Sequence, residues 1–148
     1  MSQELKFKVK FRVPPNIIYE ALTNQDMMIK YTQTPAVFEK TNGSNFFMYD
    51  KNIQGVNVEL QENNKIVQKW KFSSWPDYAE LTMVFKERAG NESTIFMHMK
   101  NIPKEDNTKR GIELKVIENG WHGQICKKIN DFCGYPINAD KTDSEDDD

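Results

Sequence analysis

Residues 37–101 read VFEKTNGSNFFMYDKNIQGVNVELQENNKIVQKWKFSSWPDYAELTMVFKERAGNESTIFMHMKN, and this stretch decides the fold. β-rich segments alternate in it with turn sequences such as TNGSN (41–45), NN (63–64) and RAGNES (88–93). Turn signals at such short intervals are typical of a multi-stranded antiparallel sheet made of hairpins. The stretch predicts a meander of about six strands, of which VFEK (37–40) is the first.

The segment before the meander predicts one more strand and two short helices. In LKFKVKFRV (5–13), five apolar residues alternate with Lys6, Lys8, Lys10 and Arg12, so the strand buries one face and exposes the other. We call these four basic residues the basic stripe. Pro14 and Pro15 end this strand and suit the first turn of a helix. An amphipathic helix follows over NIIYEALT (16–23), and a second one runs over 24–32 until Pro35 stops it.

The last predicted element is a long helix. Apolar residues recur at spacings of 3, 4, 4, 4 and 3, a helical stripe that ends before Gly134. Gly120 and Gly123 lie within it, each at a cost of about 1 kcal/mol relative to Ala. Five residues of the stripe, Leu114, Ile117, Trp121, Ile125 and Phe132, are expected to be buried against the sheet face that carries Phe7, Val9 and Phe11. The stripe consists of Leu114, Ile117, Trp121, Ile125, Ile129 and Phe132.

These elements predict an α+β fold: a curved antiparallel sheet of about six to seven strands gripping the C-terminal helix, with two short helices after the first strand. The chain has 148 residues, the length of about one domain. We assign residues 1–137 to that domain and expect residues 138–148 to be a disordered acidic tail, since Ala139 is their only apolar residue.

Composition excludes several classes of protein. Residues 143–148, DSEDDD, hold five acids, whereas residues 1–140 hold 19 basic and 17 acidic residues. Residues 1–140 thus carry only a small positive charge, whereas proteins that bind nucleic acid usually have a strongly basic surface. No apolar run approaches the roughly 20 residues that span a bilayer, and the N-terminus has no signal-like segment. We therefore expect a soluble, cytoplasmic protein that binds neither nucleic acid nor membrane.

The sequence carries no recognisable chemistry of its own. It lacks GxSxG, HExxH and phosphate-loop motifs, so we expect no enzymatic activity and no cofactor. His98 and His122 have no acidic or thiol partner at ligand spacing, which argues against a metal site. Cys126 and Cys133 lie about 10 Å apart along a helix, too far for a disulfide, and are expected to be reduced.

Several motifs resemble a known family, the C-terminal-type domain of the activator of heat-shock protein 90 ATPase, which belongs to the START-like, helix-grip superfamily. The resemblance covers about residues 5–137. The motifs are VPPNIIYEALTNQDMMIKYTQTPA (13–36), GSNFFMYDKNIQGVNVEL (43–60), KIVQKWKFSSWP (65–76), LTMVF (81–85), NIP (101–103), NGW (119–121) and FCGYP (132–136).

The resemblance implies a co-chaperone that binds heat-shock protein 90, contacts its dimerised nucleotide-binding domains and stimulates its ATPase by favouring the closed dimer. The catalytic residues would belong to the chaperone. Full-length members carry a preceding domain that docks on the chaperone's middle segment, and without it we expect weaker activation. We expect the chain to act as a monomer.

Two groups of residues are candidates for partner binding. The basic stripe is either a solvated outer face or an electrostatic docking surface for an acidic partner. Trp75 and Tyr78 lie in the loop SSWPDY (73–78), where aromatic side chains serve either as partner contacts or as a structural lid on the sheet edge.

Two alternatives remain open. START-like folds often hold an apolar ligand between sheet and helix, and seven Met and nine Phe could line such a cavity. A carrier of this kind needs a cavity of roughly 300 Å³ or more. The chain could also bind the chaperone without activating it.

Overall fold

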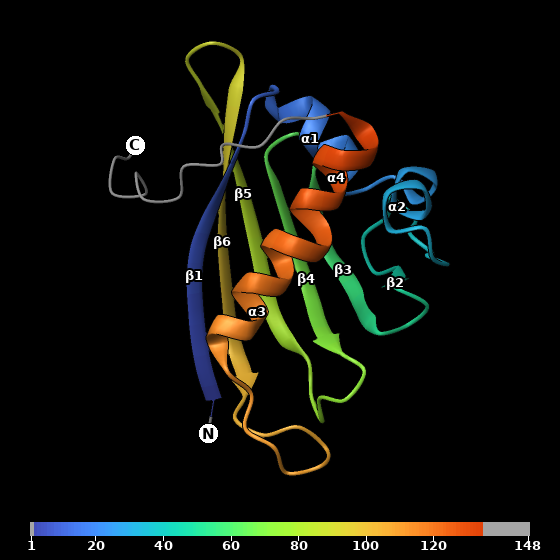
Figure 1. Ribbon diagram of the computed structural model, residues 1–148, viewed down its shortest axis with the longest axis vertical. Helices are drawn as coiled ribbons and strands as arrows, with labels where there is room; N and C mark the ends of the chain where they lie inside the picture. The colour runs from blue at the N-terminus through green and yellow to red at the C-terminus, as the bar shows by residue number, and fades with distance from the viewer. Residues whose placement is uncertain (1, 135–148) are drawn as a thin grey trace.

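The computed structural model describes residues 2–134, and these form one antiparallel sheet with all helices on one face (Figure 1). The predicted α+β architecture is confirmed. Its elements are β1 (Ser2–Phe11), α1 (Pro15–Ala21), α2 (Gln25–Thr32), β2 (Asn45–Met48), β3 (Ile53–Gln61), β4 (Lys65–Phe72), β5 (Ala79–Arg88), β6 (Glu92–Pro103), α3 (Leu114–Gly120), η1 (Trp121–Cys126) and α4 (Lys127–Cys133).

The six strands lie in the order β1-β6-β5-β4-β3-β2. From β2 to β6 each strand pairs with the next one in sequence, and β1 forms the edge of the sheet beside β6. The prediction of a strand at 37–40 is wrong. Only Val37 pairs there, as an isolated bridge to Phe47, and its side chain is 40% exposed. A four-residue segment with one paired residue adds no strand, and the described sheet has six.

The helices cover what we call the inner face of the sheet. Leu5, Phe7 and Val9 alternate toward this side, as the sequence predicts, and Leu5 and Val9 are buried. The register places Phe7 opposite Met97, Met97 opposite Met83, and Met83 opposite Ile66, so one apolar row crosses four strands. We call the opposite side, which carries Lys6, Lys8 and Lys10, the outer face.

The two short helices begin where their sequences predict. Pro15 opens α1, because its fixed φ and missing N–H suit the first helical position. The Oδ1 atom of Asn24 accepts a 2.9 Å hydrogen bond from the backbone N–H of Met27 and thereby caps α2. Buried Tyr31 donates its hydroxyl to the carbonyl of Ala21, which ties α2 to α1.

The predicted C-terminal helix is present, and its middle third is a π-helical segment. The backbone N–H of Lys127 donates to the carbonyl of His122, five residues earlier. The stripe Ile117, Trp121, Ile125, Ile129 advances by four residues a turn, more than the 3.6 of an α-helix. A π segment carries the extra residues and keeps all four side chains buried against the sheet.

The same geometry corrects the prediction for Phe132, which is 39% exposed. Phe132 follows Ile129 by three residues, while the buried stripe advances by four and continues to half-buried Cys133. Leu114 is only partly buried, at the start of α3. Trp121 lies on Trp70 of β4, with ring centroids 6.0 Å apart, and Phe7 of β1 instead meets His122 at 5.6 Å.

The predicted acidic tail, residues 138–148, lies outside the described residues. Among residues 2–134, no helix combines the length and the apolar character needed to cross a membrane.

Candidate functional site

The basic stripe lies on the outer face near the edge of the sheet. Lys6, Lys8 and Lys10 are on β1, opposite His98, Phe96 and Thr94 of β6. Lys6 is exposed, and Lys8 and Lys10 are partly exposed. Arg12 is also exposed, but it follows the last residue of the strand. Three of the four predicted residues therefore share one strand face, and the fourth lies just beyond it.

The outer face is basic well beyond this stripe. The alternation of β4, β5 and β6 adds lysines to the same side, since Lys65 pairs with Val84 and Lys100 pairs with Glu80. A single strand could not reveal this, because it depends on which strands are neighbours. The outer-face lysines are Lys6, Lys8, Lys10, Lys65, Lys69, Lys71, Lys86 and Lys100.

Apolar and acidic groups interrupt this basic surface. Phe96 is 36% exposed in the middle of the sheet, and the ammonium of Lys8 lies 5.9 Å from its ring centroid. The carboxylate of Glu4 is hydrogen-bonded to the ring of His98, and this hydrogen bond lowers the pKa of Glu4. The surface thus combines many ammonium groups with a small aromatic centre, a composition that suits an acidic protein partner.

Trp75 is not the exposed aromatic residue that a partner anchor requires. Its side chain is 3% exposed and packs edge-on against Trp70 and Phe72, with ring centroids 5.7 and 5.5 Å apart. Its backbone carbonyl accepts a 3.0 Å hydrogen bond from Nζ of Lys71. These contacts favour the interpretation of Trp75 as a structural lid over that of a partner contact.

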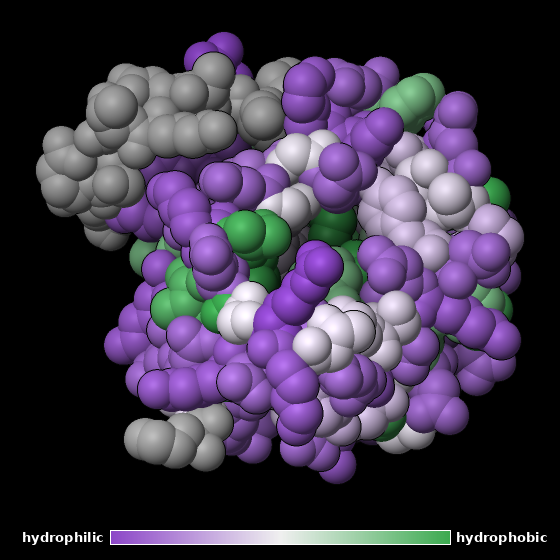
Figure 2. Space-filling model, turned by 60° about the horizontal axis from the view of Figure 1, so that its bottom comes forward, coloured by the Kyte–Doolittle hydropathy of each residue, from purple (hydrophilic) through white to green (hydrophobic). Residues whose placement is uncertain are grey.

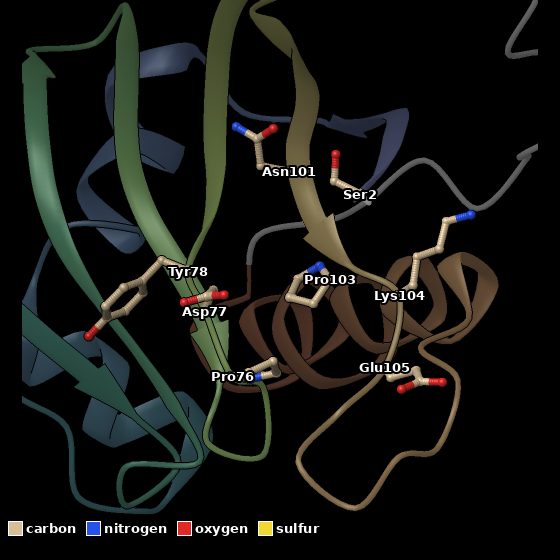
Figure 3. Close-up of a pocket in the computed structure, with 8 residues that line it drawn as sticks. All are labelled: Ser2, Pro76, Asp77, Tyr78, Asn101, Pro103, Lys104 and Glu105. Atoms are coloured by element: carbon tan, nitrogen blue, oxygen red, sulfur yellow. The ribbon is translucent and has the colours of Figure 1, made fainter.

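Tyr78, by contrast, is 40% exposed, and the Nζ atom of Lys71 lies 5.5 Å from its ring centroid. It lines an open hollow of about 570 Å³ at the end of the sheet, which we call the terminal hollow (Figure 3). The hollow is lined by Ser2, Pro76, Asp77, Tyr78, Asn101, Pro103, Lys104 and Glu105.

Two of the motifs that carry the family resemblance meet at the terminal hollow. Pro76 ends the motif SSWP, and Asn101 and Pro103 belong to NIP, 25 residues or more further along the chain. Figure 3 shows the loop residues Pro76 and Asp77 facing the β6 end across the hollow. The backbone N–H of Asn107 donates a 2.8 Å hydrogen bond to the carbonyl of Ser74, which links the loop after β6 to the loop between β4 and β5. The terminal hollow was not predicted from the sequence. It could have been indicated by one feature: several of its residues belong to the motifs that carry the family resemblance.

Figure 2 brings this end of the molecule forward. Polar side chains cover most of the visible surface, and hydrophobic ones gather around a depression near its middle.

A smaller cavity lies between the sheet and the C-terminal helix. Its volume is about 150 Å³, and Trp70, Phe72, Tyr49 and Trp121 supply its aromatic walls. The Tyr49 hydroxyl donates to the carbonyl of Gln124 beside it, and burial raises the pKa of Tyr49. Nε1 of Trp121 is buried without a hydrogen-bond partner among the described residues.

The described residues hold no cluster of three or more His, Cys, Asp or Glu side chains that could bind a metal ion. Cys126 is buried and Cys133 is half-buried, the described residues form no disulfide with either, and burial raises the pKa of Cys133.

The profile of the family described as activator of Hsp90 ATPase homolog 1-like protein matches residues 12–133. The human activator of 90 kDa heat shock protein ATPase homolog 1 is 32% identical over 119 residues, which are 78% of this chain and 35% of that protein. The homologue from Dictyostelium discoideum is 28% identical over 136 residues, 90% of this chain and 34% of its own. The chain thus spans about a third of the length of these curated relatives.

A solved structure agrees with the same family. The crystal structure of PFC0360w, described as an HSP90 activator from Plasmodium falciparum, has a TM-score of 0.85 and 26% identity, over 91% of this chain and 99% of that one. The START-like architecture expected from the resemblance is thereby confirmed. The chain belongs to the family of activator of Hsp90 ATPase homolog 1-like proteins.

Proposed function

We propose that this chain is a co-chaperone that binds heat-shock protein 90 and stimulates its ATPase by favouring the closed dimer. The observation that carries the proposal is the match over 99% of PFC0360w, a chain of similar extent that is itself described as an HSP90 activator. The family membership supports the same conclusion. In this proposal the catalytic residues belong to the chaperone, and this chain acts as a cytoplasmic monomer.

The proposed contact surface consists of the basic stripe and Tyr78. Lys6 and Tyr78 are exposed, and Ser2, on the same strand as Lys6, lines the terminal hollow together with Tyr78. Lys6 lies four residues after Ser2, about 13 Å along the extended strand, so one partner surface can cover both groups. Trp75 is left out of this surface because its indole is buried.

The proposed mechanism is a population shift. A protein that supplies no catalytic group can accelerate turnover only by binding the active conformation more tightly than the inactive one. Contact with both nucleotide-binding domains of the closed dimer, which the family resemblance implies, would have this property.

The cavity between sheet and helix argues against the carrier alternative. Its volume of about 150 Å³ is half of the roughly 300 Å³ at which ligand pockets begin. Aromatic rings occupy the space that an apolar ligand would need, so we do not propose a carrier function.

The test is a coupled assay of the chaperone's ATPase with and without this protein. We expect stimulation of severalfold, reduced by the double substitution Lys6→Glu and Lys8→Glu and by Tyr78→Ala. The matched control is Lys109→Glu with Lys115→Glu, since both lysines are exposed and neither belongs to the proposed surface.

Circular dichroism of each variant verifies the fold before the assay. No stimulation and no binding at high micromolar concentration would contradict the co-chaperone proposal. Binding without stimulation would instead support a scaffold that binds the chaperone without activating it.

A further inference from the structure

The cavity between the sheet and the C-terminal helix has the size of a single aromatic ring. It lies where this helix passes over the sheet (Figure 1), and Ile53 of β3, Trp70 of β4 and Ile125 of η1 are among the residues that line it. Its volume is about 150 Å³, and an apolar cavity of about that volume can hold one benzene molecule. The space is therefore too small for the larger apolar ligand of a carrier, but it is sufficient for one ring.

Aromatic side chains line this cavity from both sides. Trp70 and Phe72 contribute from β4, where their ring centroids lie 4.9 Å apart in an edge-on contact. Trp121 contributes from the helix, with its ring centroid 6.0 Å from that of Trp70. Such walls favour an aromatic occupant, because edge-to-face and offset ring contacts add to the gain from burying apolar surface. None of the described residues that line the cavity carries a charge, and a buried charge without a partner is costly, so the occupant should be neutral.

One polar group of the cavity wall lacks a hydrogen bond. The side chain of Trp121 is 5% exposed, and its Nε1 atom has no hydrogen-bond partner among the described residues. An indole N–H can only donate, and it usually has an acceptor where it is buried. Because Trp121 lines the cavity, a molecule in it that carries an acceptor can supply the partner of this N–H. The wall thus selects for an aromatic ring with an acceptor over a plain hydrocarbon ring.

Two uncommon backbone conformations meet at the same cavity. Tyr49, Asp50 and Lys51 have φ angles of 52°, 52° and 76°, which places three consecutive non-glycine residues in the left-handed region that their Cβ atoms disfavour. On the other side, the π segment η1 carries Trp121 and Gln124 into the wall. The hydroxyl of Tyr49 donates to the carbonyl of Gln124 and joins the two segments. Strained backbone and π-helical turns are both frequent at binding sites, where the surrounding structure holds them in place.

We propose that this cavity binds a neutral molecule with one aromatic ring and a hydrogen-bond acceptor, and that the acceptor takes the N–H of Trp121. The ring packs against Trp70 and Phe72, and the hydrogen bond from Tyr49 to Gln124 holds the wall in place around it. The inference rests on the cavity alone and does not depend on the proposed co-chaperone function.

Benzonitrile and phenylacetylene are a matched pair of probes, because they have nearly the same size and shape and only benzonitrile carries a nitrogen acceptor. Each is titrated into the full ¹⁵N-labelled chain, and the indole N–H resonance of Trp121 is followed after assignment through Trp121→Phe. Benzonitrile should bind saturably, move this proton downfield and bind on the order of tenfold more tightly than phenylacetylene, because a buried donor gains its partner. Equal affinities of the two probes, or no binding of benzonitrile at millimolar concentration, would overturn the proposal.

Three full-length variants locate the site. Trp121→Phe keeps an aromatic ring and removes the N–H, so the preference for benzonitrile should disappear while the spectrum still shows a folded protein. Gly120→Leu places a side chain at the cavity wall, where an added Cβ meets no atom within 4 Å, and should weaken benzonitrile binding at least tenfold. Gly123→Leu is its control, since the space around that Cβ is equally open and Gly123 does not line the cavity. A preference that survives Trp121→Phe, or equal weakening by both leucine variants, would contradict binding in this cavity.

Discussion

Gly55 shows how one missing side chain permits the pairing of β3 with its neighbours. A Cβ atom at this position would lie 2.1 Å from the backbone carbonyl oxygen of Lys69 and about 2.5 Å from the ring of Phe46. The carbonyl belongs to β4 and Phe46 to β2, so neither can move without disturbing a paired strand.

Gly55→Ala should therefore destabilise the protein by about 1–3 kcal/mol, the usual cost of overpacking a core. Urea unfolding followed by far-UV circular dichroism measures the change. The matched control is Gly111→Ala, where an added Cβ would meet no atom within 4 Å. Equal stabilities of the two variants would refute the steric explanation.

Trp75 leads to a prediction about stability. Because its indole is 3% exposed against Trp70 and Phe72, Trp75→Ala should cost about 3–5 kcal/mol of folding free energy. Tyr78→Ala is the comparison, since Tyr78 is 40% exposed and its removal should leave unfolding nearly unchanged. If Trp75→Ala left the urea midpoint unchanged but weakened binding to the chaperone, Trp75 would be a partner contact and not a structural lid.

At the scale of elements, the carboxylate of Glu20 joins α1 to the start of α2 and to the segment before β2. Its Oε1 atom pairs with Nζ of Lys40 at 2.6 Å, and its Oε2 atom accepts a 2.7 Å hydrogen bond from Nδ2 of Asn24. The hydrogen bond from Lys40, followed by that from Asn24, lowers the pKa of Glu20 below its ordinary 4.5. The stabilisation is thus present above pH 4.5 and is lost as the pH falls through the lowered pKa.

Glu20→Gln should accordingly cost about 0.2–1 kcal/mol at pH 7, the range for exposed ion pairs, and less at pH 3, below the ordinary pKa of a Glu carboxyl. Urea unfolding of both proteins at the two pH values gives the difference. Glu105→Gln, an exposed substitution on the opposite loop, should show no such change with pH. A cost for Glu20→Gln that stays constant between pH 7 and pH 3 would rule out the ion pair as its cause.

The elements that could be predicted are those whose pattern is local. The alternation in β1 and the hairpin turns of β3 to β6 depend on neighbouring residues, and both were confirmed. The π segment and the exposure of Phe132 depend on how a four-residue repeat of buried side chains packs against the sheet, which periodicity alone did not reveal. The burial of Trp75 could not be predicted, because it depends on which strands are neighbours. The same holds for the lysines of β1, β4, β5 and β6, which share one face only in this strand order.

At the scale of the whole molecule, charge is distributed unevenly. The eight outer-face lysines lie on the side of the sheet opposite to the described helices (Figure 1). Such an asymmetric field orients the molecule toward an acidic partner before contact and raises the association rate more than it lowers the dissociation rate.

If the proposed co-chaperone binds through this face, its association rate constant should fall steeply as salt rises from about 50 to 300 mM, because exposed charges are screened over about 8 Å at physiological salt. Lys6→Glu with Lys8→Glu should slow association more than it speeds dissociation, as stopped-flow fluorescence can measure. Lys109→Glu with Lys115→Glu makes the same change in net charge away from this face. If both double variants slowed association equally, net charge alone would account for the effect and the outer face would not be the docking surface.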